Sequence, residues 1–258
     1  MKTPRSILIT GASSGIGAAL ARHNAAKGIH LSLSGRDAVR LNAIADECRG
    51  KGASVATALI DVTDADSMRT WIDVTDYHHP LDLVIANAGI SGGTAGGGES
   101  AEQARRIFDV NLTGTLNTID PAIQRMQKRK KGQIALFSSL AGFSGWPGAP
   151  AYSAAKGAVR AYGEALRGSL ARHGIEVNVV CPGFVATPMT DVNPYHMPLL
   201  MPAGRAADII AAGLAKNRGR IAFPLPTYLF VRLMAALPLD LGLALRRRLP
   251  EKPATSKA

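Results

Sequence analysis

Short apolar runs alternate along the chain with longer, alanine-rich segments of helical pattern. Isoleucine, valine and leucine dominate the short runs, as is typical of strands buried on both faces of a sheet. Such runs predict strands at residues 6–10, 30–34, 54–60, 83–86, 133–138, 176–181 and 220–223. Between them, helices are predicted up to about residue 27 and at residues 37–51, 102–128, 151–172 and 203–217. This alternation predicts a single doubly wound α/β domain of the Rossmann type, with a parallel sheet flanked by helices.

Several polar and small residues directly follow the predicted strands. Right-handed crossovers bring the carboxyl ends of parallel strands to one edge of a sheet, where such domains bind their ligands. The residues expected to meet at this edge are Gly11, Asp61, Asn87, Ser139 and Pro182. Their convergence predicts a single functional site.

The first strand runs into a glycine-rich turn, Gly11-Ala-Ser-Ser-Gly15-Ile-Gly17, which opens an alanine-rich helix. Glycines allow the turn to tighten and the backbone to approach a pyrophosphate, which then lies at the positive end of the helix. An ordinary glycine turn is the alternative. The strand before it and the helix after it favour a nucleotide site.

The end of the second strand indicates which dinucleotide is bound. A carboxylate there would hold both ribose hydroxyls of NAD and repel a 2′-phosphate. The chain has Gly35 and then Arg36, whose guanidinium suits a phosphate, so NADP(H) is predicted over NAD(H). A solvated surface arginine is the alternative, and the neighbouring Asp37, which is also expected to cap the next helix, weakens the argument.

Tyr152 and Lys156 lie four residues apart at the start of a predicted helix, which places them on one helical face. An ammonium group beside a phenol stabilises the phenolate and lowers the phenol pKa toward the working range of an acid or base. Asn111 lies inside another apolar helix. It is interpreted either as a hydrogen-bonded core amide or as a catalytic residue that holds a water molecule.

The composition indicates which ligands the chain can bind and in which cell compartment it is expected. Hydrophobic residues make up 47% of the 258 positions, the net charge is +11 and the pI is about 10.1. Such a basic chain suits a phosphorylated cofactor or an anionic membrane; nucleic acid is not expected, because no aromatic residues interleave with the basic ones. The two cysteines and the absence of a signal peptide or metal-ligand cluster predict a metal-free protein in the cytoplasm, with peripheral contact to a membrane surface as a further option.

Taken together, these motifs resemble the classical short-chain dehydrogenase/reductase family over residues 5–223. They are Thr10-Gly11-x-x-x-Gly15-x-Gly17, Asn87-Ala88-Gly89, Asn111, Ser139, Tyr152-x-x-x-Lys156 and Pro182-Gly183. The resemblance implies a seven-stranded parallel sheet, a nicotinamide cofactor and a homodimer or homotetramer. The chain departs from the family pattern at Ala86, where asparagine is common.

The resemblance also implies individual roles. Tyr152 would be the acid or base, Ser139 would polarise the carbonyl, Lys156 would bind the nicotinamide ribose and tune Tyr152, and Asn111 would hold a water. The expected catalytic residues are thus Asn111, Ser139, Tyr152 and Lys156. The expected cofactor contacts are Gly11, Ser13, Ser14, Gly15, Ile16, Gly17, Arg36, Asp61, Val62, Asn87, Ala88, Gly89, Tyr152, Lys156, Pro182, Gly183, Val185 and Thr187.

Two apolar segments bear on the substrate and on membrane contact. Residues 189–201, together with Phe143 and Trp146, are expected either to line an apolar substrate pocket or simply to pack over the core. Residues 1–223 form the predicted catalytic domain. Residues 224–258 form an apolar and basic extension, which the prolines at positions 224, 226 and 238 divide into short pieces. This extension is interpreted as a lid, a subunit contact or a membrane-surface segment.

The predicted activity is NAD(P)(H)-dependent interconversion of a carbonyl and an alcohol. Reduction of an apolar ketone or aldehyde with NADPH is the expected direction. The alternative is a non-catalytic protein that binds NADP(H) as a sensor or scaffold, since one fold can serve different functions. A sensor has no need for Ser139, Tyr152 and Lys156 together.

Overall fold

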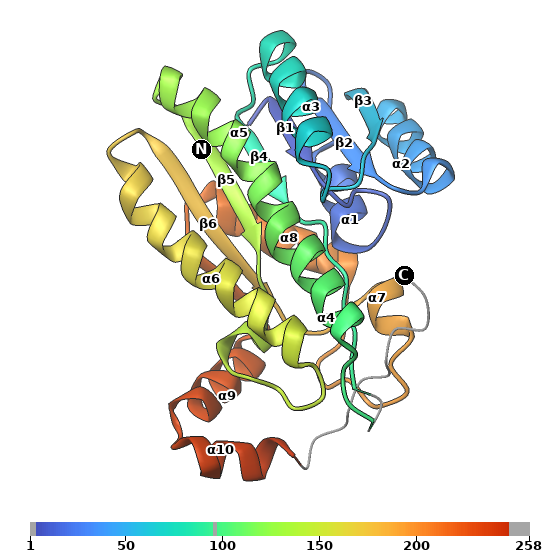
Figure 1. Cartoon of the computed structure of the whole chain (residues 1–258). Coiled ribbons are helices and arrows are strands. Elements are labelled where there is room, and N and C mark those ends of the chain that lie inside the picture. Colours follow the sequence, from blue (N-terminus) through green and yellow to red (C-terminus); the bar gives the residue numbers. More distant parts are fainter. Residues whose placement is uncertain (1–3, 95–96, 248–258) are drawn as a thin grey trace.

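The computed structural model describes residues 4–94 and 97–247 and is built on a seven-stranded sheet (Figure 1). The strand order is β3-β2-β1-β4-β5-β6-β9, and every neighbouring pair is parallel. The bounds are β1 Ser6–Ile9, β2 His30–Gly35, β3 Ser54–Leu59, β4 Leu83–Ala86, β5 Gly132–Phe137, β6 Ile175–Pro182 and β9 Arg220–Phe223. The doubly wound α/β architecture is therefore confirmed.

Helices cover both faces of this sheet (Figure 1). They are α1 Gly15–Asn24, α2 Ala38–Gly50, α3 Ala65–His78, α4 Ala101–Phe108, α5 Gly114–Arg129, α6 Pro150–Ala171 and α8 Ala203–Ala215. Side chains of β1 alternate between the two layers because successive residues of a strand point to opposite faces. Ile7 and Ile9 pack with α1, α2 and α8, whereas Leu8 packs with α3, α5 and α6. All three are at most 1% exposed.

Two helices begin at an aspartate cap, and the one at Asp37 is the cap that the sequence predicts. The Asp37 side chain accepts a hydrogen bond from the Arg40 amide at the start of α2, and the Asp64 side chain accepts one from the Ser67 amide at the start of α3. These bonds satisfy amide groups that have no partner within the helix. The Asp37 carboxylate therefore accepts a hydrogen bond from the helix that it precedes.

The single helix predicted for residues 102–128 is wrong in one respect. A π-helical turn, Asp109–Thr113, interrupts it between α4 and α5. The wider turn accommodates one extra residue and is found frequently at functional sites. Here it places the Asn111 side chain against the backbone of Ile90, a residue in the loop after β4. No local pattern of the helix predicts this contact, because Ile90 lies 21 residues earlier in the chain.

The extension after β9 forms two helices, α9 Leu225–Ala236 and α10 Leu239–Arg246. The prediction that Pro226 breaks this segment is wrong, because Pro226 lies in the first helical turn, where its missing amide hydrogen has no partner to lose. Val231 and Met234 of α9 are buried, and Val231 packs with Leu140 and Val179. Within the described residues, no helix combines the length and apolar character that crossing a membrane requires.

Candidate active site

The turn between β1 and α1 is shaped by glycines that no other residue can replace. Gly11 and Gly15 have φ angles of +66° and +56°, a region that side chains rarely adopt. A Cβ atom at Gly17 would lie 2.3 Å from the Gly11 carbonyl oxygen and 2.6 Å from Asn87 Nδ2. The amides at the start of α1 thus stand open at the edge of the sheet, as a phosphate-binding turn requires.

Asn87 joins this turn to the end of β4. Its Nδ2 donates to the Thr10 and Gly11 carbonyls at 2.9 and 3.2 Å, and the amides of Asn87 and Ala88 both donate to Thr10 Oγ1 at 3.2 Å. Ala86, where the family often has asparagine, is an apolar residue of the core. The bonds of Asn87 therefore hold two strand ends in register, and Asn87 also lines the adjoining pocket.

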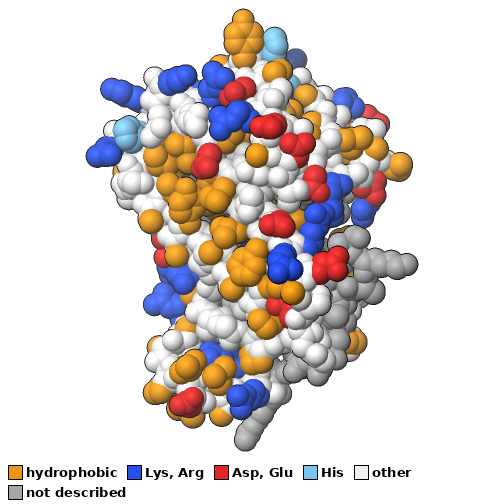
Figure 2. All heavy atoms as spheres, viewed as in Figure 1, with side chains coloured by type: hydrophobic (Ala, Val, Ile, Leu, Met, Phe, Trp, Pro, Cys, Tyr) orange, Lys and Arg blue, Asp and Glu red, His pale blue; other side chains and the backbone are white. Residues whose placement is uncertain are grey.

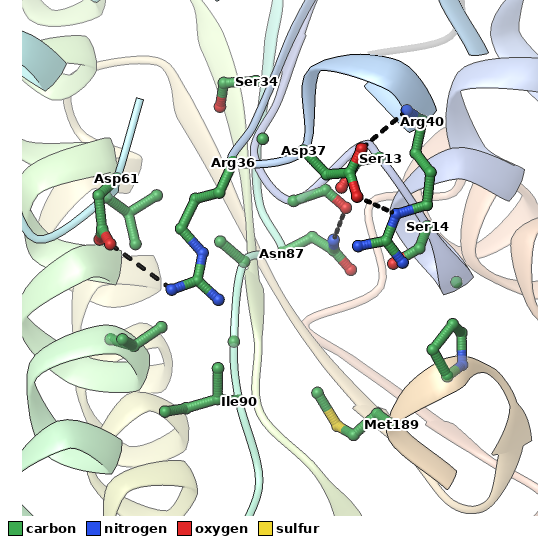
Figure 3. Close-up of a pocket in the computed structure, with 18 of the residues that line it drawn as sticks. Ser13, Ser14, Ser34, Arg36, Asp37, Arg40, Asp61, Asn87, Ile90 and Met189 are labelled. Carbon is green, nitrogen blue, oxygen red and sulfur yellow. Dashed lines mark hydrogen bonds and ion pairs between the residues drawn. The ribbon is translucent and has the colours of Figure 1, made fainter. Parts of the chain in front are cut away.

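A pocket of about 750 Å³ lies along this edge of the sheet (Figure 3). It collects most of the predicted cofactor contacts: Gly11, Ser13, Ser14, Gly15, Ile16, Arg36, Asp61, Val62, Asn87, Ala88, Gly89 and Thr187. Gly17, Tyr152, Lys156, Pro182, Gly183 and Val185 are not among its lining residues. Sequence reasoning missed Arg40, Ile90 and Met189, which do line it. Arg40 was foreseeable, because it lies in the first turn of the helix that begins directly after Arg36 and Asp37.

Charged residues surround one end of the pocket. Arg36 extends across it, with Nη1 3.7 Å from Asp61 Oδ2 (Figure 3). Partial burial opposes ionisation of Asp61, but hydrogen bonds from Thr63 and the charges of Arg106 and Arg36 hold its pKa below the ordinary value. Asp61 is thus a carboxylate that already has cationic partners.

No carboxylate side chain stands at the end of β2. Its last residue is Gly35, and a Cβ there would already lie 3.0 Å from Ser13 Oγ. Asp37 follows, but its carboxylate accepts from the Arg40 amide at 2.9 Å and from Arg40 Nε at 2.7 Å. Arg36 and Arg40 both line the pocket. This end of the pocket therefore presents guanidinium groups, and its nearest aspartate is neutralised by one of them.

Ser139 and Tyr152 meet where β5 ends and α6 begins. The Ser139 hydroxyl lies near enough to the Tyr152 phenol to lower its pKa; Ser139 Oγ accepts from the Ala141 amide at 3.1 Å and donates to the Pro182 carbonyl at 3.5 Å. Burial raises the pKa of Tyr152 above its ordinary value, with Ser139 acting in the opposite direction. The phenol is therefore protonated at neutral pH and can donate.

Lys156 lies one turn further along α6 and is only 4% exposed. Its Nζ donates to the Phe137 carbonyl at 2.9 Å and lies 6.0 Å from the centroid of the Tyr152 ring. Burial lowers the pKa of Lys156 to about 8. The predicted lowering of the Tyr152 pKa by this ammonium is not seen: burial raises this pKa, and the group that opposes the rise is Ser139, not Lys156.

Asn111 is fully buried, and both ends of its amide bond Ile90. Oδ1 accepts from the Ile90 amide at 2.8 Å, and Nδ2 donates to the Ile90 carbonyl at 2.9 Å. Its backbone carbonyl accepts from Thr115 Oγ1 at 2.7 Å. The interpretation as a hydrogen-bonded core amide is thus supported. A Cβ at Gly89 would lie 2.8 Å from Asn111 Oδ1 and 3.2 Å from Lys156 Nζ, so both side chains adjoin the pocket through this glycine.

The chain after β6 closes the other side of the pocket. The Gly183 amide donates to the Phe223 carbonyl at 2.7 Å, and Val185 lies in the short strand β7 Val185–Ala186, which pairs with β8 Met201–Pro202. Thr187 precedes the short helix α7 Pro188–Asp191, and its Cγ2 would lie 3.0 Å from a Cβ at Gly15. The chain after β6 therefore approaches the phosphate-binding turn from across the pocket.

The segment expected to line an apolar pocket with Phe143 and Trp146 is placed differently. Met189 lines the cofactor pocket, whereas Phe143 and Trp146 line a second cavity of about 630 Å³ with Leu243 and Arg247 of the extension. The Phe143 ring lies 5.5 Å from the Tyr228 ring of α9. The loop after β5 therefore shares its cavity with the extension, whereas Met189 lines the other cavity.

No group of three or more His, Cys, Asp or Glu side chains is arranged to hold a metal ion in residues 4–94 and 97–247. Cys48 and Cys181 are buried and unpaired. Burial raises the pKa of Cys181 to about 12, so this thiol is inert as a nucleophile at neutral pH.

Comparisons with known proteins agree with this arrangement. The family model described as short chain dehydrogenase matches residues 5–196. An uncharacterized oxidoreductase of Myxococcus xanthus is 37% identical over 95% of this chain and 97% of its own length. The granaticin polyketide synthase putative ketoacyl reductase 1 of Streptomyces violaceoruber is 38% identical over 71% of this chain and 69% of that protein.

Two solved structures with different bound dinucleotides are also similar. The short-chain dehydrogenase from Sphingobium yanoikuyae in complex with NADPH is 28% identical, with a TM-score of 0.78, over 97% of this chain and 98% of that one. A short chain dehydrogenase from Mycobacterium paratuberculosis bound to NAD is 28% identical, with a TM-score of 0.76, over 86% of this chain and 96% of that one. The match over residues 5–196, together with the shared fold, shows that the chain belongs to the short-chain dehydrogenase/reductase family of oxidoreductases.

Proposed function

We propose that the protein is an NADPH-dependent reductase of apolar ketones or aldehydes, working reversibly on the corresponding alcohols. The observation that carries the proposal is that Ser139 lies beside Tyr152 where β5 ends and α6 begins, with the buried Lys156 one turn beyond Tyr152 on α6. A hydroxyl and a protonated phenol side by side are suited to bond one carbonyl oxygen.

The pocket residues suit a nicotinamide dinucleotide. The amides at the start of α1 would hold the pyrophosphate, with Ser13 and Ser14 beside it. Asp61 and Val62 would lie at the adenine, Ala88 and Gly89 at the central ribose groups, and Thr187 at the nicotinamide end. When bound, the dinucleotide supplies the hydride of the reaction.

The protein's own contribution is to orient the carbonyl and to supply a proton. Ser139 and Tyr152 donate hydrogen bonds to the carbonyl oxygen, and these bonds strengthen as negative charge develops on it. Tyr152 then gives its proton to the alkoxide. The phenol is protonated at neutral pH, so it can donate in the reductive direction. Lys156 stabilises the phenolate that remains.

Asn111 enters the proposal as a positioning residue that holds a water near Lys156. Its side-chain amide is occupied by Ile90, and its backbone carbonyl accepts from Thr115 Oγ1. A carbonyl oxygen has two lone pairs and can accept a second bond. The π-helical turn supports this role, because it sets Asn111 beside Gly89 at the edge of the pocket.

Preference for NADPH is supported by the charges at the end of β2. Gly35 leaves no carboxylate at the position that would hold the ribose hydroxyls, and Arg36 and Arg40 both line that end of the pocket. A 2′-phosphate would compete with Asp61 for Arg36, whose ion pair is long at 3.7 Å. Guanidinium groups bind phosphate with two parallel hydrogen bonds. The contacts that Arg36 would make with a 2′-phosphate are therefore expected to be stronger than the long ion pair with Asp61 that they replace.

An apolar substrate is supported by the side chains near the nicotinamide end. Met189 lines the pocket beside Thr187, and Ile90 and Val110 line its opposite side. Methionine adapts to irregular apolar ligands. Homodimer or homotetramer formation is proposed from the family resemblance alone.

The proposal is tested by following NADPH oxidation with carbonyl compounds graded from small and polar to long and apolar, with NADH measured in parallel. We expect turnover to rise with the apolar length of the substrate and to be weaker with NADH. Tyr152→Phe should abolish turnover while cofactor binding, measured by NADPH fluorescence, is kept. Tight NADPH binding with no turnover across the panel would instead favour the sensor or scaffold alternative.

A further inference from the structure

Helix α9 is apolar on two opposite sides. One side carries Val231 and Met234, which are 3% and 9% exposed, and Val231 packs with Leu140 and Val179. The other side carries Leu225, Leu229 and Leu233, at i, i+4 and i+8, which are 62%, 58% and 60% exposed. A helix that is apolar all round is normally covered on every side, in a core or in a membrane.

Helix α10 adds to this exposed apolar surface. Leu241 and Leu245, also four residues apart, are 52% and 41% exposed, and Phe230 of α9 is 46% exposed. Figure 2 shows hydrophobic side chains gathered at the end of the molecule that α9 and α10 form in Figure 1. We call this surface the tail face; it consists of Leu225, Leu229, Phe230, Leu233, Leu241 and Leu245.

The tail face is bordered by positive charge. Arg232 lies in α9 and Arg247 directly after α10, and both are exposed. Arg246 is only 6% exposed; its Nη1 donates to the Met234 carbonyl at 3.4 Å, and its Nε has no partner within the described residues. Asp240 is the single acidic residue of the two helices. The helix pair therefore combines an exposed apolar surface with more arginines than carboxylates, so its net charge is positive.

These features distinguish between possible occupants. A second copy of the chain, packed symmetrically, would bring together two patches that are each bordered by arginines, and α9 and α10 of each copy offer only Asp240 to balance them. A membrane-spanning role does not fit either, because 12 residues of α9 extend only about 18 Å, against the roughly 30 Å of a bilayer core. An anionic bilayer surface satisfies both features, since acyl chains cover leucines and phosphates neutralise arginines.

We propose that α9 and α10 form a docking surface for anionic phospholipid bilayers, in which the tail face enters the acyl boundary and the exposed Arg232 and Arg247 lie at the headgroups. The cavity beneath α10 has the matching character. Trp146 and Leu243 line it with Arg247, and Trp146 Nε1 has no hydrogen-bond partner among the described residues.

The docking surface is connected to the catalytic loop. Phe143, four residues after Ser139, stacks edge-on against Tyr228 of α9, whose hydroxyl accepts from Arg220 Nη1 at 3.0 Å. Docking would thus place the loop that follows Ser139 close to the bilayer. This suits a substrate dissolved in the membrane, although the docking proposal itself stands independently of the proposed activity.

The test is co-sedimentation of the full chain with vesicles, in the absence of cofactor and substrate. Vesicles of phosphatidylcholine alone are compared with vesicles that also contain phosphatidylglycerol, each at low and at high salt. We expect binding to the anionic vesicles, weak binding to the neutral ones, and loss of binding as salt screens the arginines.

Two double variants separate the apolar and the charged contributions. Leu229→Gln with Leu233→Gln should weaken partitioning by roughly tenfold or more, since two exposed leucines are lost from the acyl boundary. Arg232→Gln with Arg247→Gln should weaken it by about 25-fold, at about fivefold for each arginine near an anionic surface.

Matched controls lie on α3 and elsewhere on the catalytic domain. Val74→Gln with Tyr77→Gln removes two apolar side chains that are 54% and 83% exposed, and Lys27→Gln with Arg69→Gln removes two exposed charges. Both control variants should bind vesicles as the parent does. NADPH fluorescence of each variant checks that the cofactor site remains folded.

Three outcomes would overturn the proposal. The first is no binding to anionic vesicles at low salt, and the second is unchanged binding by the leucine variant. The third is a smaller particle mass for the leucine variant in sedimentation analysis, which would make the tail face a contact between copies of the chain. Because vesicle binding is measured without turnover, its failure and a failure of the proposed activity are distinguishable.

Discussion

At the scale of single residues, Lys156 shows how chemistry and stability oppose each other. Its ammonium is buried beside Gly89 and donates to the Phe137 carbonyl, and no carboxylate of the described residues pairs with it. A residue chosen for stability alone would be apolar here, because burying a charge is unfavourable. The site therefore retains a destabilising group where the proposed mechanism needs a cation.

This opposition predicts a specific pH dependence of stability. Burial lowers the pKa of Lys156 from 10.5 to about 8 in the folded protein. Below about pH 8 the lysine is charged in both states and destabilises the fold. Between pH 8 and 10.5 the unfolded chain binds the proton more tightly, so stability rises with pH. Relative to Lys156→Met, the parent should gain up to about 3 kcal/mol in free energy of unfolding across this interval.

Denaturant unfolding of both proteins at several pH values between 7 and 10.5 measures this difference. Titration of other lysines, tyrosines and cysteines is common to the two chains and cancels in the comparison. A constant difference across the interval would mean that Lys156 is not destabilised by its burial.

Arg36 carries the second prediction at this scale. Arg36→Gln removes the cation proposed to bind the 2′-phosphate, and a hydrogen bond to a charged group contributes about 1.5–3 kcal/mol. We expect the KM for NADPH to rise by roughly 10- to 100-fold, while the KM for NADH stays unchanged. Arg49→Gln is the control, since Arg49 pairs with Asp46 in α2. An equal change for both dinucleotides would assign Arg36 a structural role instead.

At the scale of elements, the β1–α1 turn depends on one helical glycine. Gly17→Ala places a Cβ within 2.3 Å of the Gly11 carbonyl, so the turn must move away from Asn87. We expect loss of NADPH binding and a free energy of unfolding lower by about 1–3 kcal/mol. Gly50→Ala at the end of α2 has nothing within 4 Å of its Cβ and should be neutral or slightly stabilising. Isothermal titration and thermal melts of both variants provide the comparison.

The amino ends of β2 and β3 predict sensitivity to acid. His30 stacks on His79 with ring centroids 3.6 Å apart and bonds Ser54 Oγ at 3.1 Å. Burial and the neighbouring His79 lower the pKa of His30 below 6.5. Burial thus disfavours the protonated form of His30 in the folded protein. The contribution of His30 to the free energy of unfolding is fully present above pH 6.5 and is lost as the pH falls from 6.5 toward the lowered pKa of the folded state.

We therefore expect the free energy of unfolding to fall between pH 7 and 5, and the fall to be smaller in His30→Gln. His78→Gln, which removes an exposed histidine of α3, should keep the slope of the parent. Urea unfolding across this pH range measures all three. If His30→Gln keeps the parental slope, the stacked pair is not the acid-sensitive element.

At the scale of the whole molecule, the extension behaves as part of the core. Val231 and Met234 of α9 are buried, and Val231 packs with Leu140, Val179 and Cys181. A chain that ends after Phe223 would expose this cluster and lose about 3–6 kcal/mol, at 1.5–3 kcal/mol per buried side chain. Its melting temperature should fall by roughly 10 °C or more. A chain that ends after Leu237 keeps α9 and should melt closer to the full chain; equal melting of all three would show that α9 adds no stability.

Local signals account for what the sequence by itself determined. Alternating apolar runs and helical segments predicted the seven parallel strands, and the rule for strand ends placed Gly11, Asn87 and Ser139 on one edge. The spacing of Tyr152 and Lys156 placed both on one helical face. These features depend on residue type and short spacing, which the chain carries independently of how distant segments pack.

Contacts between distant segments decided the rest. The π-helical turn at Asn111 is held by Ile90, 21 residues away, and Phe143 turns toward Tyr228 of the extension, where sequence reasoning grouped it with residues 189–201. The raised pKa of Tyr152 and the lowered pKa of Lys156 arise from burial, which depends on everything that packs around them. Only the tertiary structure sets these properties, because each is a sum over neighbours that are remote in the sequence.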